Sequence, residues 1–246
     1  MPSAFITGTS SGLGRGLAAR LLDSDWQVFG CSRRGCDLPG IQDSRIDLTD
    51  HQALPAKLDK LLGKTGELNL VVLNAGTLGE IRHLVDSPLD KVKDTMEVNL
   101  WANKAVMDWL YLSDKTVTQI VMISSGASIL GNKGWGGYAL SKAALNMLAR
   151  LYAHEFPATH ISSLAPGIID TPMMDYLCGQ ADAQSFPALH RLRDARGTEL
   201  MSGPDQAAAK IVQVLSELRE RPSGSFVDIR EILEPGLYAQ LYSPQS

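Results

Sequence analysis

The chain has 246 residues, of which 44% are hydrophobic, and a formal net charge of −4. A chain of this length can bury one sizeable α/β core. The lack of a basic stripe argues against a nucleic-acid surface, and no apolar run approaches the roughly 18 residues of a membrane span. Three cysteines without a paired spacing, and no secretory leader, indicate a reducing, cytoplasmic setting, and we expect no metal site.

A short β run at 4–7 leads into a glycine-rich turn and then into a helical pattern of leucines. A strand, a glycine turn and a helix N-terminus form an anion site, because backbone N–H groups and the helix dipole face the ligand. Gly8 permits the turn, Gly12 lets the backbone approach a pyrophosphate, and Gly14 allows close packing of helix on strand. The alternative is an ordinary turn. Three further loop residues belong to the predicted dinucleotide site: Ser10, Ser11 and Leu13.

The second predicted strand, 27–31, is followed by Ser32, Arg33 and Arg34. An NAD-binding chain usually has an acidic residue at this strand end, hydrogen-bonded to the ribose 2′-OH. A serine with two guanidinium groups behind it suits a 2′-phosphate instead. The pattern therefore favours NADP(H) over NAD(H), with a solvated basic loop as the alternative.

A third strand is predicted at 44–48 and a helix at 49–62. Asp47 accepts a hydrogen bond from the adenine amino group or, alternatively, caps the helix that follows. We place Leu48 beside it in the cofactor site.

The apolar run at 69–76 predicts a buried parallel strand that ends in Asn74, Ala75 and Gly76, whose small size leaves room for a cofactor ring. A long helix is predicted at 88–112. Asn99 lies inside it, where a buried amide competes for backbone hydrogen bonds and needs a reason.

The strand at 119–124 ends at Ser125, and a helix is predicted at 137–156. Tyr138 and Lys142 are four residues apart and so share one face of that helix. An ammonium beside a phenol lowers the pKa of the phenol, which makes Tyr138 a candidate acid–base group near neutral pH. The alternative is an aromatic helix residue beside a solvated lysine.

The sixth strand, 159–165, leads into Pro166, Gly167 and, further on, Thr171 at the same edge of the sheet. The looser stretch 172–203 is expected to form a mobile cover over the substrate. A helix at 204–220 and a last strand at 224–229 complete the predicted elements.

Together, these motifs resemble those of the short-chain dehydrogenase/reductase family. Within it, three stretches look similar to the sepiapterin reductase and benzil reductase branch: Gly134-Trp135-Gly136-Gly137-Tyr138, Ala165-Pro-Gly-Ile-Ile-Asp-Thr-Pro-Met173 and Ser223-Gly-Ser-Phe-Val-Asp228. The order and spacing agree over essentially the whole chain. The motifs that carry the resemblance are Thr7-Gly8-x-x-x-Gly12-x-Gly14, Asp47, Asn74-Ala75-Gly76, Asn99, Ser125, Tyr138-x-x-x-Lys142 and Pro166-Gly167-x-x-x-Thr171. The resemblance implies a Rossmann-type doubly wound parallel β-sheet with helices on both faces. It also implies a single domain over 1–246, with 172–203 as the substrate-covering segment.

The family also implies roles for individual residues. Tyr138 is the general acid–base, and Ser125 holds the substrate carbonyl. Lys142 binds the nicotinamide ribose and lowers the pKa of Tyr138, and Asn99 holds a water that relays protons to Lys142. Thr171 and the backbone near Ile168 bind the nicotinamide carboxamide, and Pro166 and Gly167 belong to the same cofactor site.

A mostly apolar substrate pocket is expected beside Ser125 and Tyr138. Its other expected lining residues are Ile129, Leu130, Trp135, Met173, Met174 and Tyr176. Asp228 matches the aspartate that anchors the amino-pterin in sepiapterin reductase; the alternative is an edge-strand charge exposed to water. One departure is Ser11, where many NADP-dependent members carry a basic residue, so Arg33, helped by Arg34 or Arg15, must recognise the 2′-phosphate.

The expected activity is NADPH-dependent reduction of a ketone or vicinal diketone, so the expected partner is a small carbonyl compound rather than a nucleic acid or a membrane. Two alternatives stay open: oxidation of a secondary alcohol by the same site, and a non-catalytic NADP(H) sensor on the same fold. The helices at 88–112 and 137–156 are expected to form a homodimer interface, and a tetramer is also compatible.

Overall fold

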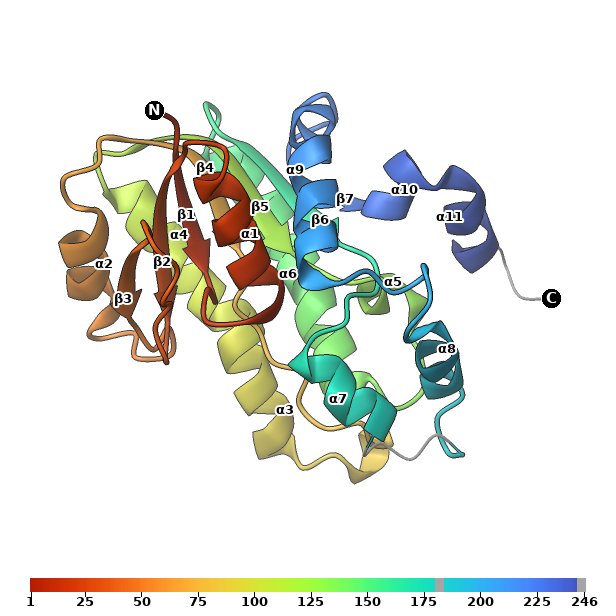
Figure 1. The fold of residues 1–246 in the computed structure, drawn as a ribbon. Coiled ribbons are helices and arrows are strands. Elements are labelled where there is room, and N and C mark those ends of the chain that lie inside the picture. The colour runs from red at the N-terminus through yellow and green to blue at the C-terminus, as the bar shows by residue number, and fades with distance from the viewer. Residues whose placement is uncertain (180–183, 243–246) are drawn as a thin grey trace.

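In the computed structural model, which describes residues 1–179 and 184–242, the chain forms a seven-stranded parallel sheet of order β3-β2-β1-β4-β5-β6-β7 (Figure 1). The strands are β1 Ser3–Thr7, β2 Gln27–Ser32, β3 Gln42–Arg45, β4 Glu67–Leu73, β5 Thr116–Ile123, β6 His160–Ala165 and β7 Ser225–Asp228. The winding reverses between β1 and β4. Ligands of such sheets bind outside the carboxyl ends of the strands at this reversal. The predicted doubly wound fold is confirmed.

Helices cover both faces of the sheet. Helices α1 and α9 pack on one face, and α2, α4 and α6 pack on the other, while α7 and α8 lie beyond the carboxyl ends of the strands (Figure 1). The helices are α1 Gly12–Leu22, α2 Leu54–Leu62, α3 Leu89–Met96, α4 Ala102–Leu112, α5 Ala127–Leu130, α6 Gly136–Glu155, α7 Pro172–Gly179, α8 Ala188–Ala195, α9 Pro204–Arg219, α10 Ile229–Leu233 and α11 Pro235–Tyr242. None of those described is both long and apolar enough to cross a lipid bilayer.

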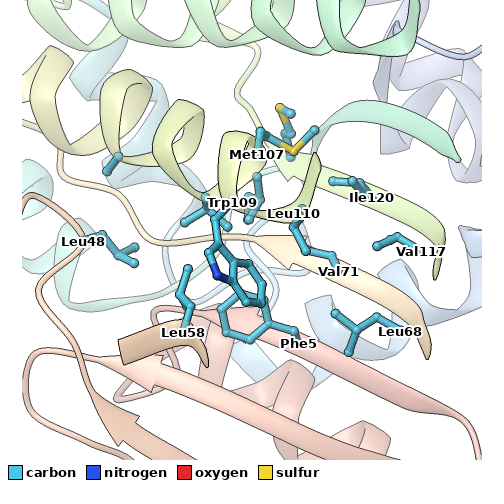
Figure 2. Close-up of a cluster of buried hydrophobic side chains, with 14 of the residues drawn as sticks. Phe5, Leu48, Leu58, Leu68, Val71, Met107, Trp109, Leu110, Val117 and Ile120 are labelled. Carbon is cyan, nitrogen blue, oxygen red and sulfur yellow. The ribbon is translucent and has the colours of Figure 1, made fainter. Parts of the chain in front are cut away.

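Two apolar clusters, one on each face, explain why the central strands are apolar throughout. On β1, Phe5 faces α2, α4 and α6, whereas Ile6 faces α1 and α9. On β4, Val71 and Val72 divide in the same way. Figure 2 shows the first cluster, in which Phe5 lies beneath Trp109 of α4. Because both faces of the strands are buried, their sequences lack the alternation of apolar and polar residues that a strand with one solvent-exposed face would show.

Three predicted elements differ from those observed. The third strand lies at Gln42–Arg45 rather than 44–48, and α2 begins at Leu54 because a turn precedes it. The helix predicted at 88–112 is divided by a π turn, Glu97–Trp101, which contains Asn99. Such turns are frequent at functional sites.

The segment 172–203, predicted as a loose cover, contains α7 and α8; its residues 180–183 lie outside the described part of the chain. It is tied back to the sheet edge where Ile169 pairs with Ser202. A third apolar cluster forms beneath it. Helices α10 and α11, after β7, were not predicted.

Candidate active site

The turn between β1 and α1 has the geometry predicted for a phosphate loop. Gly8 has a φ of +80° and donates its N–H to the Cys31 carbonyl at 2.7 Å. A Cβ on Gly14 would lie 2.4 Å from the Gly8 carbonyl oxygen, so only glycine lets the helix approach this closely. A Cβ on Gly12 would lie 3.3 Å from the Thr171 methyl. These residues fit a dinucleotide, because the bare backbone of the loop and the segment after β6 face each other.

The ends of β1 and β4 are joined through Thr7. Its hydroxyl accepts hydrogen bonds from the backbone N–H groups of Asn74 and Ala75, both at 3.0 Å. The Asn74 amide in turn donates to the Thr7 carbonyl at 2.9 Å. This contact fixes the predicted Asn-Ala-Gly strand end. Thr7 was not predicted as a site residue, although a buried threonine directly before the glycine turn is a usable signal.

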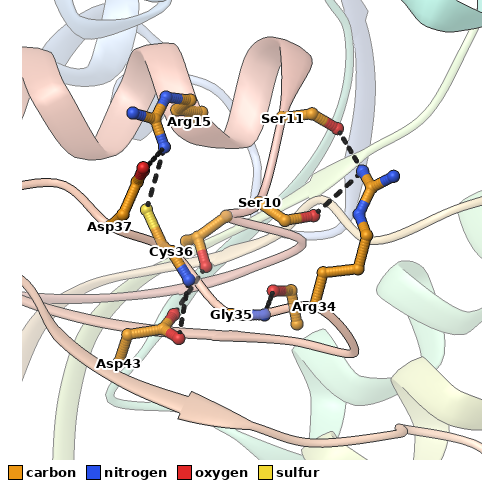
Figure 3. A network of polar contacts seen from close by, with 10 residues as sticks. Ser10, Ser11, Arg15, Arg34, Gly35, Cys36, Asp37 and Asp43 are labelled. Carbon is orange, nitrogen blue, oxygen red and sulfur yellow. Dashed lines mark hydrogen bonds and ion pairs between the residues drawn. The ribbon is translucent and has the colours of Figure 1, made fainter.

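Of the three basic residues predicted near the 2′-phosphate, Arg34 lies over the loop (Figure 3). Its Nη2 is 3.0 Å from the Ser11 hydroxyl and 3.3 Å from that of Ser10. Arg33 is exposed. Arg15 is held by Asp37 at 2.5 Å, and it also contacts the sulfur of Cys36. Arg33 and Arg34 are therefore the better placed for an added phosphate.

The loop after β2 is built on two side chains that accept backbone protons. Ser32 accepts the N–H of Gly35 at 3.0 Å. Asp43 on β3 accepts from the Thr9 hydroxyl and from the N–H of Cys36, both at 2.9 Å. Asp43 was not predicted. A carboxylate on a strand that contacts β2 is the signal that could have revealed it.

Asp47 caps a turn rather than the helix itself. Its carboxylate accepts from the backbone N–H and the hydroxyl of Thr49, at 3.0 and 2.8 Å, and these bonds lower its pKa. Helix α2 begins only at Leu54. The side chains of Leu48 and Leu13 are buried in the two core clusters, so their backbone atoms are what a cofactor could meet.

The predicted serine, tyrosine and lysine come together at the carboxyl end of β5. The ammonium of Lys142 is 5.7 Å from the centroid of the Tyr138 ring, so both side chains share a face of α6 as predicted. Ser125 lies two residues after the end of β5, and its hydroxyl hydrogen-bonds to the phenol. The Ser125 hydroxyl also accepts the backbone N–H of Ala127 at 3.2 Å, which leaves its own proton to donate.

The expected lowering of the Tyr138 pKa is wrong for this arrangement. Removal of the phenol from water raises its pKa, and the hydrogen bond from Ser125 offsets this only in part. Lys142 is 4% exposed, and burial lowers its pKa to about 8. Its ammonium donates to the Ile123 carbonyl at 2.7 Å instead of to the phenol.

The fully buried Asn99 side chain explains why the helix carries a π turn there. Its amide exchanges two hydrogen bonds with the backbone of Thr77, at 2.7 and 2.8 Å, and donates to the Ser141 hydroxyl at 2.9 Å. A Cβ on Gly76 would lie 3.1 Å from Asn99 Oδ1 and 3.6 Å from Lys142 Nζ. Asn99 thus joins the exit of β4 to α6 beside Lys142. Its expected role in a proton relay stays a prediction.

A hydrogen-bonded chain that was not predicted supports Ser125. The Ser124 hydroxyl donates to Asn146 Oδ1 at 2.6 Å, the Asn146 amide donates to the Ser128 hydroxyl at 2.9 Å, and Ser128 donates to the Ser125 carbonyl at 2.7 Å. Asn146 lies one turn after Lys142, and that spacing is the signal by which it could have been found.

Most of the predicted pocket residues belong to the third apolar cluster. Trp135 and Met174 are buried in it, with Tyr138, Met173 and Tyr176 packed against it. Leu130 instead lies next to Gly126. Ile129, also expected in the pocket wall, is 55% exposed, and its place there stays a prediction.

Asp228 is fully buried, so the alternative of a water-exposed edge charge is wrong. Its carboxylate accepts from Arg230 Nε and Nη2, at 2.8 and 2.5 Å, and from the Tyr242 hydroxyl at 2.8 Å. A Cβ on Gly126 would lie 3.0 Å from that hydroxyl, so the C-terminal segment contacts the chain directly after Ser125. Anchoring of a substrate by Asp228 stays a prediction. A bound substrate would have to share the carboxylate with Arg230 and Tyr242.

A phosphate loop, an Asn-Ala-Gly strand end and a Ser–Tyr–Lys group at the reversal of a doubly wound sheet define a nicotinamide-dependent oxidoreductase of the Rossmann type. A family model for short chain dehydrogenases matches residues 2–181. The chain belongs to the short-chain dehydrogenase family.

The chain is similar along its length to proteins of known activity. Two benzil reductases ((S)-benzoin forming) are each 28% identical to it. The match to the Saccharomyces cerevisiae protein covers 91% of this chain and 94% of that protein, and the match to the Bacillus subtilis protein covers 93% of this chain and 98% of that protein. Among solved structures, the short-chain dehydrogenase/reductase YIR035C of S. cerevisiae has a TM-score of 0.81 at 21% identity, covering 96% of this chain and 98% of that one. This last likeness concerns the fold.

Proposed function

We propose that this protein reduces a ketone or a vicinal diketone with NADPH. The observation that carries the proposal is the meeting of Ser125, Tyr138 and Lys142 beneath an apolar cluster at the ligand edge of the sheet. The similarity to two benzil reductases, whose substrate is a vicinal diketone, supports the choice of substrate class.

Ser125, Tyr138 and Lys142 each have a separate role in the proposed reaction. The Ser125 hydroxyl donates to the carbonyl oxygen and holds it against Tyr138, whose phenol gives its proton to that oxygen. NADPH supplies the hydride to the carbonyl carbon, so the products are an alcohol and NADP⁺. Lys142 holds the nicotinamide ribose, and its charge favours the phenolate left behind. The apolar wall excludes water.

Burial raises the pKa of Tyr138, so the ligand-free site holds the protonated phenol from which reduction starts. The same residues run in reverse would oxidise a secondary alcohol, and the ratio of NADPH to NADP⁺ sets the direction of the reaction in the cell.

Turnover separates the reductase from the alternative of a non-catalytic sensor. The purified protein is mixed with NADPH and a panel of vicinal diketones that includes benzil, and loss of NADPH absorbance is followed. We expect NADPH to be consumed in step with the formation of hydroxyketone. NADPH binding without turnover on any carbonyl compound would establish the sensor instead.

Arg33 and Arg34 give the proposed preference for NADPH over NADH. We expect Arg33→Ala to weaken NADPH binding by about 10- to 100-fold, because a charge-assisted hydrogen bond to the 2′-phosphate is lost, and to leave NADH nearly unchanged. Arg34→Ala should also weaken NADPH binding more than NADH binding. It should weaken NADH binding slightly as well, because Arg34 contacts Ser10 and Ser11 of the glycine-rich loop. Dissociation constants from fluorescence titration measure both.

The matched control is Arg20→Ala, which removes an exposed guanidinium from the far end of α1. It should leave both cofactors unaffected. If Arg33→Ala weakens NADPH and NADH equally, Arg33 does not touch a 2′-phosphate.

The expected homodimer stays a prediction. Three large apolar side chains of α6 are exposed, Leu140, Met147 and Leu151, and they are compatible with a partner subunit.

A further inference from the structure

Trp135 carries a buried hydrogen-bond donor that the proposed reaction does not use. The residue lies directly before α6, three positions before Tyr138, and the two ring centroids are 6.1 Å apart. Trp135 is 8% exposed, and its indole N–H meets no acceptor among residues 1–179 and 184–242. A buried tryptophan N–H usually has a partner, so this donor calls for an explanation.

The backbone around Trp135 is held from several sides, so the position of the indole is set by the fold. Arg82 donates its N–H to the Gly134 carbonyl at 3.1 Å, and Arg82 and Trp135 form a short parallel bridge. Gly134 packs so closely on the Phe186 ring that a Cβ would lie 2.5 Å from it. The Trp135 carbonyl accepts the N–H of Ala139 at 2.7 Å, which begins α6. A residue fixed in this way is suited to present a donor.

The surroundings of the indole are apolar. Its cluster also contains Leu78, Ala127 and Met174, whose side chains carry no strong acceptor. An oxygen atom that enters this cluster with a ligand would therefore find the Trp135 N–H as a ready donor, and burial without that bond would be unfavourable for both groups.

We propose that Trp135 Nε1–H donates to the second oxygen of a vicinal dicarbonyl, while Ser125 and Tyr138 hold the first. This inference rests on the proposed reductase function and adds a specificity residue to it. The two oxygens of such a compound are on adjacent carbons, so the second stays close to the catalytic group when the first is bound there. A simple ketone has no atom to accept this hydrogen bond, and the donor then remains unpaired. The site should for that reason favour diketones.

Benzil and deoxybenzoin test the proposal, because deoxybenzoin has the same skeleton with one carbonyl replaced by CH₂. Trp135→Phe removes the N–H and keeps an aromatic ring. We expect it to lower kcat/KM for benzil by about ten-fold, mainly through KM, which is the effect of one lost hydrogen bond. For deoxybenzoin the loss should stay within about three-fold, because phenylalanine retains most of the apolar area. Each variant is compared with the wild type on the same substrate, since benzil is the more reactive ketone.

Trp109→Phe is the matched control. Its indole N–H donates to Asp59 of α2 at 2.9 Å, and its ring belongs to the cluster beneath α2, α4 and α6 rather than to the cluster that contains Trp135. It should leave kcat/KM for both ketones unchanged. Equal losses on benzil and deoxybenzoin in Trp135→Phe, or no loss on either, would overturn the role of the N–H. A wild type that reduces simple ketones but not benzil overturns this inference and leaves the reductase proposal standing. A wild type that reduces no carbonyl compound overturns both.

Discussion

Replacing Tyr138 with phenylalanine is expected to lower kcat for ketone reduction by about 10²–10⁴, the usual contribution of general acid catalysis. The substitution removes one hydroxyl and keeps the ring that packs beside Trp135, so the pocket should retain its shape. NADPH binding should be nearly unchanged. Single-turnover NADPH oxidation with benzil measures the loss, and fluorescence titration measures cofactor binding.

Tyr152→Phe provides the control for this variant. It removes the same atom from the same helix, where the Tyr152 hydroxyl donates to Asp108 away from the active site. That variant should retain full activity, although it loses stability. Turnover by Tyr138→Phe within a few-fold of the wild type would show that another group protonates the carbonyl oxygen.

Replacing Lys142 with methionine is expected to inactivate the protein and at the same time to stabilise its ligand-free fold. The activity should fall by about 10²–10³, the typical cost of losing one preorganised electrostatic donor. The stability should rise because the ammonium is buried with a backbone carbonyl as its hydrogen-bond partner, and no carboxylate pairs with it in the described part of the chain. Methionine has similar length and carries no charge into that environment.

The pH dependence of this stabilisation has a definite sign. Folding lowers the pKa of Lys142 from 10.5 to about 8, so between these values the unfolded chain binds more protons than the native one. The wild type therefore gains stability from this group as pH rises from 8 towards 10.5. Below pH 8 the full penalty, about 3 kcal/mol, is present. The advantage of Lys142→Met should be largest at neutral pH and should shrink as pH approaches 10.

Urea unfolding of wild type and variant at several pH values measures this difference, and the subtraction removes contributions from other groups such as Tyr138. Lys104→Met is the control, since its exposed ammonium pairs with Asp108 on the surface and should change stability little. A variant that is less stable than the wild type at pH 7 would show that the hydrogen bond to Ile123 outweighs the burial of the charge.

The sheet and the ends of its strands could be predicted because they are encoded locally. Runs such as 70–73 are apolar on both faces, and the residue after each run marks the ligand edge. The pairing of Tyr138 with Lys142 is likewise a matter of helical spacing alone. Boundaries were less certain where a polar turn precedes an element, as before α2, where Asp47 and Asp50 both bond to nearby backbone groups.

What could not be predicted depends on contacts between distant parts of the chain. The direction in which the Tyr138 pKa shifts is set by the burial of the phenol, and spacing along a helix does not reveal burial. The π turn at Asn99 follows from its bonds to Thr77 and Ser141, which are 22 and 42 residues away. Asp228 was considered as either a substrate anchor or a surface charge, because one of its actual partners, Tyr242, belongs to a helix with no strong pattern in the sequence.

The contact between Tyr242 and Gly126 matters to anyone who makes or labels this protein. The last described helix ends against the catalytic loop, whereas Met1 is exposed at the opposite rim of the sheet (Figure 1). An affinity tag or a fluorescent fusion joined at the C-terminal side would therefore follow a helix whose Tyr242 contacts the loop after Ser125. A tag placed ahead of Met1 leaves that region undisturbed.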